Sequence, residues 1–389
     1  MREETPSLLE ARRRRGQGTV TDFDGSRLAL ARRLARLPRA QLAREIGVTP
    51  TAITQFERAG SRGGNRPTAP VLAALAERLE VPEDFFRNGR PVAPLPAAAA
   101  HFRSLRATPA LARDQALAFA ELAMDVVDAV EQYVDLPPVD LPALELPESP
   151  TRSDLAAAAA RTRADLDVPD GPVAHVVRLL EAHGVVVLRL PAQVAGRPLD
   201  SDVDAFSSSV TTRPVVLLSP VKDDKARSRF DAAHELGHLV MHHDDAEPGN
   251  KLIEGQAQSF AAEFLMPAEQ VVEDLPRRLD WEQLHAAKRR WGTSLRALVY
   301  RARALGVLSE SAYKRANITL ASQGNPEAGP LGPPESPSLL GAAADLLNQH
   351  GTSLEHLARA TRVPLGQVVD VVAAGSDSRP RLQLQVPQG

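Results

Sequence analysis

The amino-acid sequence predicts a multidomain chain that is mostly α-helical and contains one α+β domain. Short amphipathic segments with helical spacing occupy the region from 26 to 86 and recur through most of the chain. Short β-rich runs bounded by turn residues are confined to the stretch from 184 to 219. Segments rich in Pro, Gly and Ser separate these regions, and 389 residues suffice for several hydrophobic cores.

These changes in composition place the domain boundaries. An irregular arm precedes a bundle of short helices, and a Gly/Pro/Ser segment precedes a small helical module near the end. The predicted segments are a disordered arm (1–25), a helix-turn-helix domain (26–89), a linker with one long helix from about Pro109 to Val134 (90–150), an α+β domain (151–320), a second linker (321–338), a small helical module (339–375) and a tail (376–389).

The α+β domain mixes both kinds of element. Apolar residues at helical spacing predict helices over 154–165, 173–183, 225–242, 254–265, 281–291 and 293–305. Runs rich in β-branched residues predict strands over 184–190, 205–210 and 214–219.

The composition excludes several kinds of protein. The chain has no cysteine, so disulfides, zinc ribbons and thiol nucleophiles are excluded, and a metal would have to be held by histidine and carboxylate. The first residues, MREETPSLLEARRRRGQG, lack the apolar core of a signal peptide. No apolar run approaches the roughly 18 residues that span a bilayer. We therefore expect a soluble cytoplasmic protein with no membrane partner.

The net charge of −3 conceals an uneven distribution. The segment from Arg27 to Arg90 contains 12 arginines and 6 acidic residues, which gives it a net charge of +6. Residues 1–26 are neutral overall, so the rest of the chain carries −9. A basic domain ahead of an acidic body indicates that the first domain binds a polyanion.

The segment RAQLAREIGVTPTAITQFERAG, residues 39–60, has the pattern of a helix-turn-helix. A small residue at Ala43 lets two helices cross closely, and Gly47 permits the tight turn between them. Thr49 is placed to cap the second helix, with Pro50 at its first position. With the surrounding leucines and the VPEDFF segment, residues 26–86 resemble the Cro/C1-type (XRE) helix-turn-helix family, which implies a five-helix bundle.

The resemblance implies double-stranded DNA as a partner. The second helix would lie in the major groove, with Thr51, Thr54 and Gln55 toward the base edges. Arginines would lie near phosphates, namely Arg39, Arg58, Arg62 and Arg66. The alternative is a helical protein-interaction domain with solvated arginines, and the charge together with the motif favours DNA. These side chains carry too little base information to propose an operator.

The segment His234-Glu235-Leu236-Gly237-His238 has the spacing of a metal site. Histidines four apart on a helix project from one face, so both imidazoles can bind one zinc ion. Glu235 can then act as the general base for a water molecule at the open position. The motif also occurs by chance on solvated surface helices, but its apolar surroundings indicate a buried helix, where two imidazoles need a partner.

A zinc site needs a third protein ligand. The longer pattern HExxHxxGxxH fails here, because the chain has Met241 and Asp244 in place of Gly and His. A carboxylate on the next helix is the other route, and EGQAQSFAAEFLMP offers Glu254 and Glu263. These two lie nine residues apart, about 180° around a helix, so only one of them can face the metal.

The two segments RSRFDAAHELGHLVMHH and EGQAQSFAAEFLMP are together similar to the ImmA/IrrE family of zinc metallo-endopeptidases, over roughly residues 170–305. Gln258 and Phe264 depart from the residues usual in that family. The resemblance implies a zincin-like fold with a small antiparallel sheet beside the motif helix. It also implies Glu254 as the third zinc ligand and a structural role for Glu263. For His242 we expect support of a ligand rather than ligation itself.

Two functions follow from these residues. The first is a DNA-binding regulator whose zinc peptidase domain cleaves a partner protein, in this family typically a repressor or antitoxin. The second is a transcription factor whose peptidase-like domain only senses zinc or a ligand. An intact Glu235 favours hydrolysis, because a sensor does not need that carboxylate. A purely structural zinc site fits three protein ligands poorly.

The helical module at 339–375 has a modest charge, which favours packing or interaction over DNA binding. Its segment QHGTSLEHLARATRVPLGQVVDVV nevertheless resembles a second helix-turn-helix-like unit. A homodimer is the other partner we consider, because helix-turn-helix proteins commonly dimerise, although no sequence feature demonstrates it.

Overall fold

The computed structural model describes the chain from the start of the helix-turn-helix domain to the C-terminal module. The described residues are 19–59, 64–87, 95, 109–194, 196–198, 203, 205–209, 211–219, 224–242, 250–324 and 327–376. Three predictions fall outside them: the arm over residues 1–18, the phosphate contact of Arg62 and the tail from 377. Asp244 and His243 also lie outside the described residues.

The N-terminal domain is the predicted five-helix bundle, in which the fifth element is a single 3-10 turn. Its elements are α2 (Gly25–Leu34), α3 (Arg39–Glu45), α4 (Pro50–Glu57), α5 (Ala69–Leu79) and η1 (Glu83–Phe86). The ordered domain begins earlier than the predicted boundary at 26, because Thr19 bridges to Thr68 and Phe23 to Arg87. The Phe23 side chain is fully buried against Phe86, so residues 19–25 belong to this domain.

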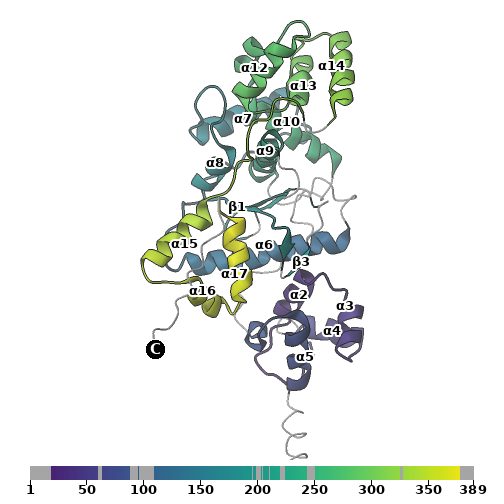
Figure 1. Ribbon diagram of the computed structural model, residues 1–389, viewed down its shortest axis with the longest axis vertical. Helices are drawn as coiled ribbons and strands as arrows, with labels where there is room; N and C mark the ends of the chain where they lie inside the picture. The colour runs from purple at the N-terminus through teal and green to yellow at the C-terminus, as the bar shows by residue number, and fades with distance from the viewer. Residues whose placement is uncertain are drawn as a thin grey trace, which may run out of the picture.

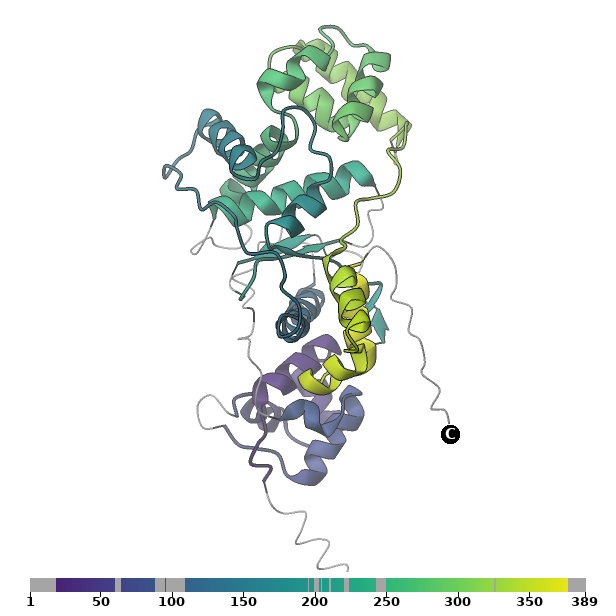
Figure 2. The same ribbon diagram turned by 90° about the vertical axis from the view of Figure 1, so that its left-hand side faces the viewer.

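Helix α6 (Ala110–Val130) lies at the centre of the molecule. Every residue from 115 to 127 is buried, as expected of a helix that is surrounded by protein. Figures 1 and 2 show α6 between the helix-turn-helix domain and the sheet, with the C-terminal module beside it. This helix was predicted as part of a linker, but it is the element on which the other parts of the molecule pack.

Ion pairs fasten α2 to α6. The Arg27 guanidinium lies 3.4 Å from Asp125, and Arg33 Nη1 donates to Glu121 at 2.6 Å. Both carboxylates are almost fully buried. Removal of one partner from such a pair leaves a charge buried without compensation, so these contacts hold the DNA-binding domain in one orientation on α6.

The sheet of the α+β domain has the strand order β1-β5-β4. Its strands are β1 (Val186–Arg189), β4 (Phe206–Ser208) and β5 (Val215–Leu218), and a separate hairpin joins β2 (Gln193–Val194) to β3 (Arg197–Pro198). The predicted antiparallel sheet is wrong in one respect, because β1 pairs with β5 in parallel and only β4 is antiparallel to β5. The long connection between β1 and β5, which contains the hairpin and β4, permits the parallel pairing.

Strand alternation assigns the two faces of the sheet to different cores. Val186 and Leu188 belong to the core that contains α6, while Val187 and Val216 belong to the core of the α+β domain. The sheet therefore separates the DNA-binding half of the molecule from the half that contains the HExxH motif.

The helices of the α+β domain lie on the far side of the sheet from α6 (Figure 1). They are α7 (Arg152–Asp165), α8 (Val176–Ala182), α9 (Lys225–Met241), α10 (Lys251–Leu265), α11 (Ala268–Val271) with η3 (Val272–Asp274), α12 (Trp281–Trp291), α13 (Leu295–Ala304) and α14 (Glu310–Gln323). Helix α14 is not among the predicted helices. A Ser309 hydroxyl that accepts from the Ala312 amide caps it, and Ala312, Ala316 and Leu320 form its buried face.

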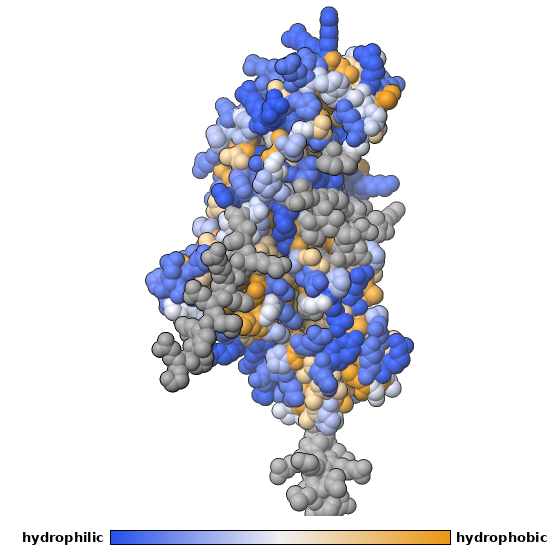
Figure 3. Space-filling model, viewed as in Figure 1, coloured by the Kyte–Doolittle hydropathy of each residue, from blue (hydrophilic) through white to orange (hydrophobic). Residues whose placement is uncertain are grey.

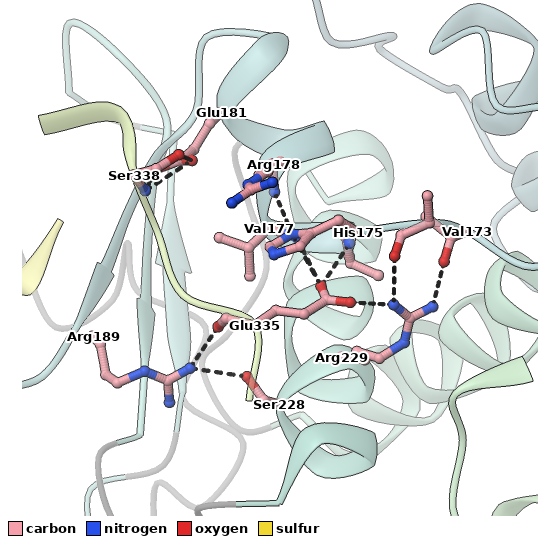
Figure 4. A network of polar contacts seen from close by, with 12 residues as sticks. Val173, His175, Val177, Arg178, Glu181, Arg189, Ser228, Arg229, Glu335 and Ser338 are labelled. Atoms are coloured by element: carbon pink, nitrogen blue, oxygen red, sulfur yellow. Dashed lines mark hydrogen bonds and ion pairs between the residues drawn. The ribbon is translucent and has the colours of Figure 1, made fainter. Parts of the chain in front are cut away.

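Residues 327–338, predicted as part of a linker, form an ordered strap (Figure 4). The buried Glu335 carboxylate accepts from the Val176 and Val177 amides at 2.7 and 3.2 Å, at the first turn of α8. It also pairs with Arg229 of α9, and the Glu335 carbonyl accepts from Arg189 at 2.7 Å. Because one carboxylate satisfies a helix terminus and a buried guanidinium, the strap is fixed on the surface of the domain.

The strap leads into the C-terminal module, which consists of α15 (Leu339–Gln349), α16 (Leu354–Thr361) and α17 (Leu365–Ala374). Glu181 of α8 accepts from the Ser338 and Leu339 amides, which caps α15. Helix α17 has buried Val368, Val371 and Val372 and packs on α6 and β1. The second helix of this helix-turn-helix-like unit therefore faces protein rather than solvent.

Within the described residues, none of the helices combines the length and the apolar content that crossing a membrane requires.

Candidate metal centre and nucleic-acid interface

Helix α9 positions the histidine motif inside the protein. Asp224 caps its first turn by accepting from the Arg227 amide at 3.0 Å, and all residues from 231 to 241 are buried. Gly237, inside the motif, allows α10 to approach closely, because a Cβ atom there would lie 2.9 Å from the Phe260 ring. The small residue between the two histidines thus brings the next helix within reach of their rings.

The two histidine rings and one carboxylate converge on a single point. His234 Nε2 lies 3.1 Å from His238 Nε2. The Glu254 carboxylate oxygens lie 3.3 Å from His234 Nε2 and 3.6 Å from His238 Nε2. One ligand atom from each of the three residues lies within 4.8 Å of the others, and both histidines are at most 1% exposed. This is the three-residue set that the sequence analysis predicted.

Glu263, the other candidate carboxylate, does not take part. It forms a buried ion pair with Arg301 of α13, which also donates to the Met266 carbonyl at 2.9 Å. Glu254 and Glu263 lie on opposite sides of α10, as their spacing requires. Glu263 therefore joins α10 to α13 instead of facing the histidines.

Glu235 is buried beside the histidines and is held by a residue that the sequence analysis missed. Ser207 Oγ of β4 donates to Glu235 Oε2 at 2.6 Å, and both residues are at most 1% exposed. Nothing in the short run around Ser207 marks it as functional, because its role depends on the pairing that places β4 beside α9. The hydroxyl restrains one carboxylate oxygen and so fixes the orientation of the Glu235 side chain.

His242 supports His238, in line with the expectation that it is not a ligand. His242 Nε2 lies 2.9 Å from Gln256 Oε1, and its Nδ1 lies 3.0 Å from His238 Nδ1. A neutral His242 that donates from Nε2 to the amide oxygen can only accept at Nδ1. His238 then donates from its own Nδ1, which leaves its Nε2 lone pair directed at the point of convergence.

The helix-turn-helix domain presents a second polar surface, and this one faces solvent. Thr51, Gln55 and Arg58 are exposed along one side of α4. Thr54 is half-buried, and its hydroxyl donates to the Pro50 carbonyl at 3.1 Å. The Thr49 hydroxyl caps α4 by accepting from the Ala52 amide, as predicted.

Arg39, predicted to lie near phosphates, is half-exposed and paired with a carboxylate. Its Nε lies 2.5 Å from Glu57 Oε2, and the same carboxylate accepts from Arg32. Glu57, at the end of α4, thus joins the last turn of α2 to the start of α3. The guanidinium of Arg39 retains an exposed face, with 51% of the side chain accessible.

Two family models match separate segments of the chain. Residues 28–86 match the model described as helix-turn-helix, and residues 180–303 match the model of the IrrE N-terminal-like domain. None of the curated proteins matches the chain. The chain therefore carries an XRE-type helix-turn-helix segment of the DNA-binding kind, followed by a metallopeptidase-like segment that contains α9, α10 and the converging residues.

Proposed function

We propose that this chain is a DNA-binding regulator whose central domain is a zinc metallo-endopeptidase that cleaves a partner regulatory protein, such as a repressor or antitoxin. The observation that carries the proposal is the convergence of His234, His238 and Glu254 beside a buried Glu235. The helix-turn-helix match in the same chain supports the regulatory part of the proposal.

The three converging residues fit a zinc ion. Two imidazole nitrogens and one carboxylate form the ligand set of many catalytic zinc sites, and three protein ligands leave a position open. His238 receives the orientation that such a ligand needs from His242 and Gln256. Glu254 is fixed at the start of α10, where Asn250 caps the helix by accepting from the Leu252 amide.

When bound, zinc would supply Lewis-acid activation of a water molecule and of the scissile carbonyl. The carboxylate of Glu235 takes the proton from the attacking water and later delivers it to the leaving amine. Ser207 donates to Glu235 Oε2, which orients the carboxylate for this proton transfer. Burial of Glu235 and both histidines excludes bulk water from the reacting groups.

The terminal strand of the sheet offers a way to hold a protein substrate. The edge of β4 that faces away from β5 pairs with no other described strand. An extended substrate segment that adds to this edge would pass close to Ser207 and therefore to Glu235. Main-chain pairing of this kind suits a peptide bond in a flexible segment of a partner protein.

Cleavage of a candidate partner tests the proposal directly. The purified chain is incubated with repressors encoded by neighbouring genes, once loaded with zinc and once after chelation, and the products are identified by mass spectrometry. We expect one defined cleavage in the zinc-loaded sample alone. Zinc-dependent changes in DNA binding without cleavage of any partner, or of the chain itself, would support the sensor function instead.

A further inference from the structure

A second pair of helices, α12 and α13, repeats the local geometry of the DNA-binding pair α3 and α4. Each turn contains a glycine with positive φ, Gly47 at 72° and Gly292 at 63°. Two residues after each glycine, a hydroxyl side chain caps the second helix. The caps are Thr49 and Ser294, and each accepts from the amide three residues further on at 3.1 Å.

The exposed residues of α4 and α13 occupy the same positions relative to the glycine of the preceding turn. The exposed side of α4 carries Thr51, Gln55 and Arg58. The positions of α13 equally far from the glycine of the turn carry Arg296, Tyr300 and Arg303, and all three are exposed. The corresponding interior positions, Ile53 and Leu298, are both fully buried.

The exposed side of α13 lies in a strongly basic region. Residues 277–315 contain ten lysines and arginines and three acidic residues, a net charge of +7 in a chain whose total is −3. Eight of the ten cations are exposed; they are Arg277, Arg278, Arg289, Arg290, Arg296, Arg303, Lys314 and Arg315. In Figure 3 the surface over α12 to α14 is largely hydrophilic.

Some of these cations have carboxylate partners, and others do not. Arg290 pairs with Asp274, Arg296 Nε lies 3.9 Å from Glu327 Oε1, and Arg303 and Lys314 share Glu310. Among the described residues, no carboxylate lies within ion-pair distance of the cations at 277, 278, 289 and 315. Exposed pairs of this kind contribute little to stability, so most of the positive charge is available to a ligand.

The first turn of α13 is already occupied by protein. Glu327 of the strap accepts from the Leu295 and Arg296 amides at 2.7 and 3.1 Å and pairs with Lys288. A ligand would therefore be bound by the exposed side chains and not by the end of the helix. The same contact makes the α12–α13 pair rigid, because the strap joins both helices.

We infer that the exposed side of α13, with the arginines around it, is a second surface for duplex DNA, at the end of the molecule opposite to the helix-turn-helix domain (Figure 1). Guanidinium groups at Arg296 and Arg303 bind phosphates, and the Tyr300 hydroxyl between them donates to the backbone. The capped helix-turn-helix geometry suits the groove of a duplex. Two DNA surfaces at opposite ends let one chain hold two duplexes or two parts of one.

The inference does not depend on peptidase activity, and its test separates the two DNA surfaces. In the full chain, the changes Gln55→Glu and Arg58→Glu prevent the exposed side of α4 from binding DNA. Into this background we introduce Arg296→Gln with Arg303→Gln, and in parallel the control pair Arg161→Gln with Arg359→Gln, which removes the same charge from exposed helix positions elsewhere. Binding to a labelled random-sequence duplex of about 20 base pairs is measured by fluorescence anisotropy at several salt concentrations.

We expect the Arg296→Gln and Arg303→Gln changes to weaken the remaining affinity by about tenfold. They should also lower the salt slope by about 2, because each lost phosphate contact reduces the number of counterions released on binding by about one. The control pair should change the affinity by less than about twofold. Equal losses in both variants, or no loss in either, would overturn the inference. So would a variant that binds DNA normally but fails to process a partner protein, because the surface would then be a protein-docking face.

Thermal unfolding of each variant shows whether it is folded. If the α13 pair is unfolded, Arg289→Gln with Arg315→Gln serves as the second test, because neither guanidinium has a carboxylate partner among the described residues. A loss of affinity in that folded variant supports the same surface, and an unchanged affinity contradicts it.

Discussion

Helices α9 and α4 both carry functional side chains, but they present them in opposite ways. The histidines and the glutamate of the α9 motif are at most 1% exposed and contact other parts of the chain. Thr51, Gln55 and Arg58 of α4 face solvent. A buried site is complete before its ligand arrives, because its groups already have fixed neighbours. An exposed site is completed only by its partner, so its side chains have little effect on folding.

The largest expected effect follows removal of a buried ligand. The change His234→Ala deletes one of three converging atoms, and we expect metal affinity to fall by more than the roughly 100-fold that loss of an outer-shell partner can cause. Cleavage should be abolished. Metal content by elemental analysis and a competing chelator measure the first effect. Wild-type metal content in a folded His234→Ala protein would contradict the assignment.

The next effect separates chemistry from metal binding at the same site. Glu235→Gln keeps the shape of the side chain but cannot accept a proton, so turnover should fall by about 10²–10⁴-fold while metal content stays unchanged. Single-turnover cleavage and elemental analysis of the same sample provide the comparison. The mechanism fails if cleavage remains intact with zinc bound.

A smaller effect is expected at Ser207, whose hydroxyl only positions Glu235. Ser207→Ala should lower kcat by roughly tenfold or more with little change in KM, since a hydrogen bond to a charged group contributes about 1.5–3 kcal/mol. Ser207→Thr, which retains the hydroxyl, should recover much of the rate. Equal losses in the two variants would show that Ser207 acts through packing.

On α4 the same reasoning predicts loss of binding without loss of stability. Gln55→Ala with Arg58→Ala should weaken operator binding by about tenfold or more, because base-edge and phosphate contacts are lost together. The midpoint of thermal unfolding should stay nearly constant, because both side chains are exposed. A large drop in that midpoint would show that α4 is less independent of the core than its exposure indicates.

The smallest effect is expected at Asp154, a half-buried residue in the first turn of α7. The Thr151 hydroxyl and amide donate to the Asp154 carboxylate, which lowers the pKa of that carboxyl. A lowered pKa means that the ionised carboxylate stabilises α7 above its unfolded pKa and that this stabilisation is lost on acidification. Asp154→Ala should therefore slightly destabilise the chain at neutral pH and have no effect in strong acid. Chemical denaturation at both pH values measures the free energy of unfolding. An equal loss of stability at the two pH values would contradict the prediction.

Local patterns in the sequence determined a large part of this protein. The spacing of His234 and His238 places both rings on one helix face whatever surrounds the helix. Gly47 and Thr49 identify the turn and cap of the helix-turn-helix, since a positive φ and a capping hydroxyl are needs of the backbone itself. The choice of Glu254 over Glu263 combined the helical period with a family resemblance, and the geometry agrees with it.

Tertiary structure alone decided the features that depend on distant residues. Ser207 reaches Glu235 only because β4 pairs with β5 beneath α9, and β1 is parallel to β5 only because of the path between them. The Glu335 carboxylate holds the strap in place because it contacts the first turn of α8 and Arg229. Its neighbours in the sequence do not predict these contacts. Helix α6 is central because parts of the chain that are distant in sequence pack on it. Periodicity shows that a face is apolar, but only the fold determines what covers it.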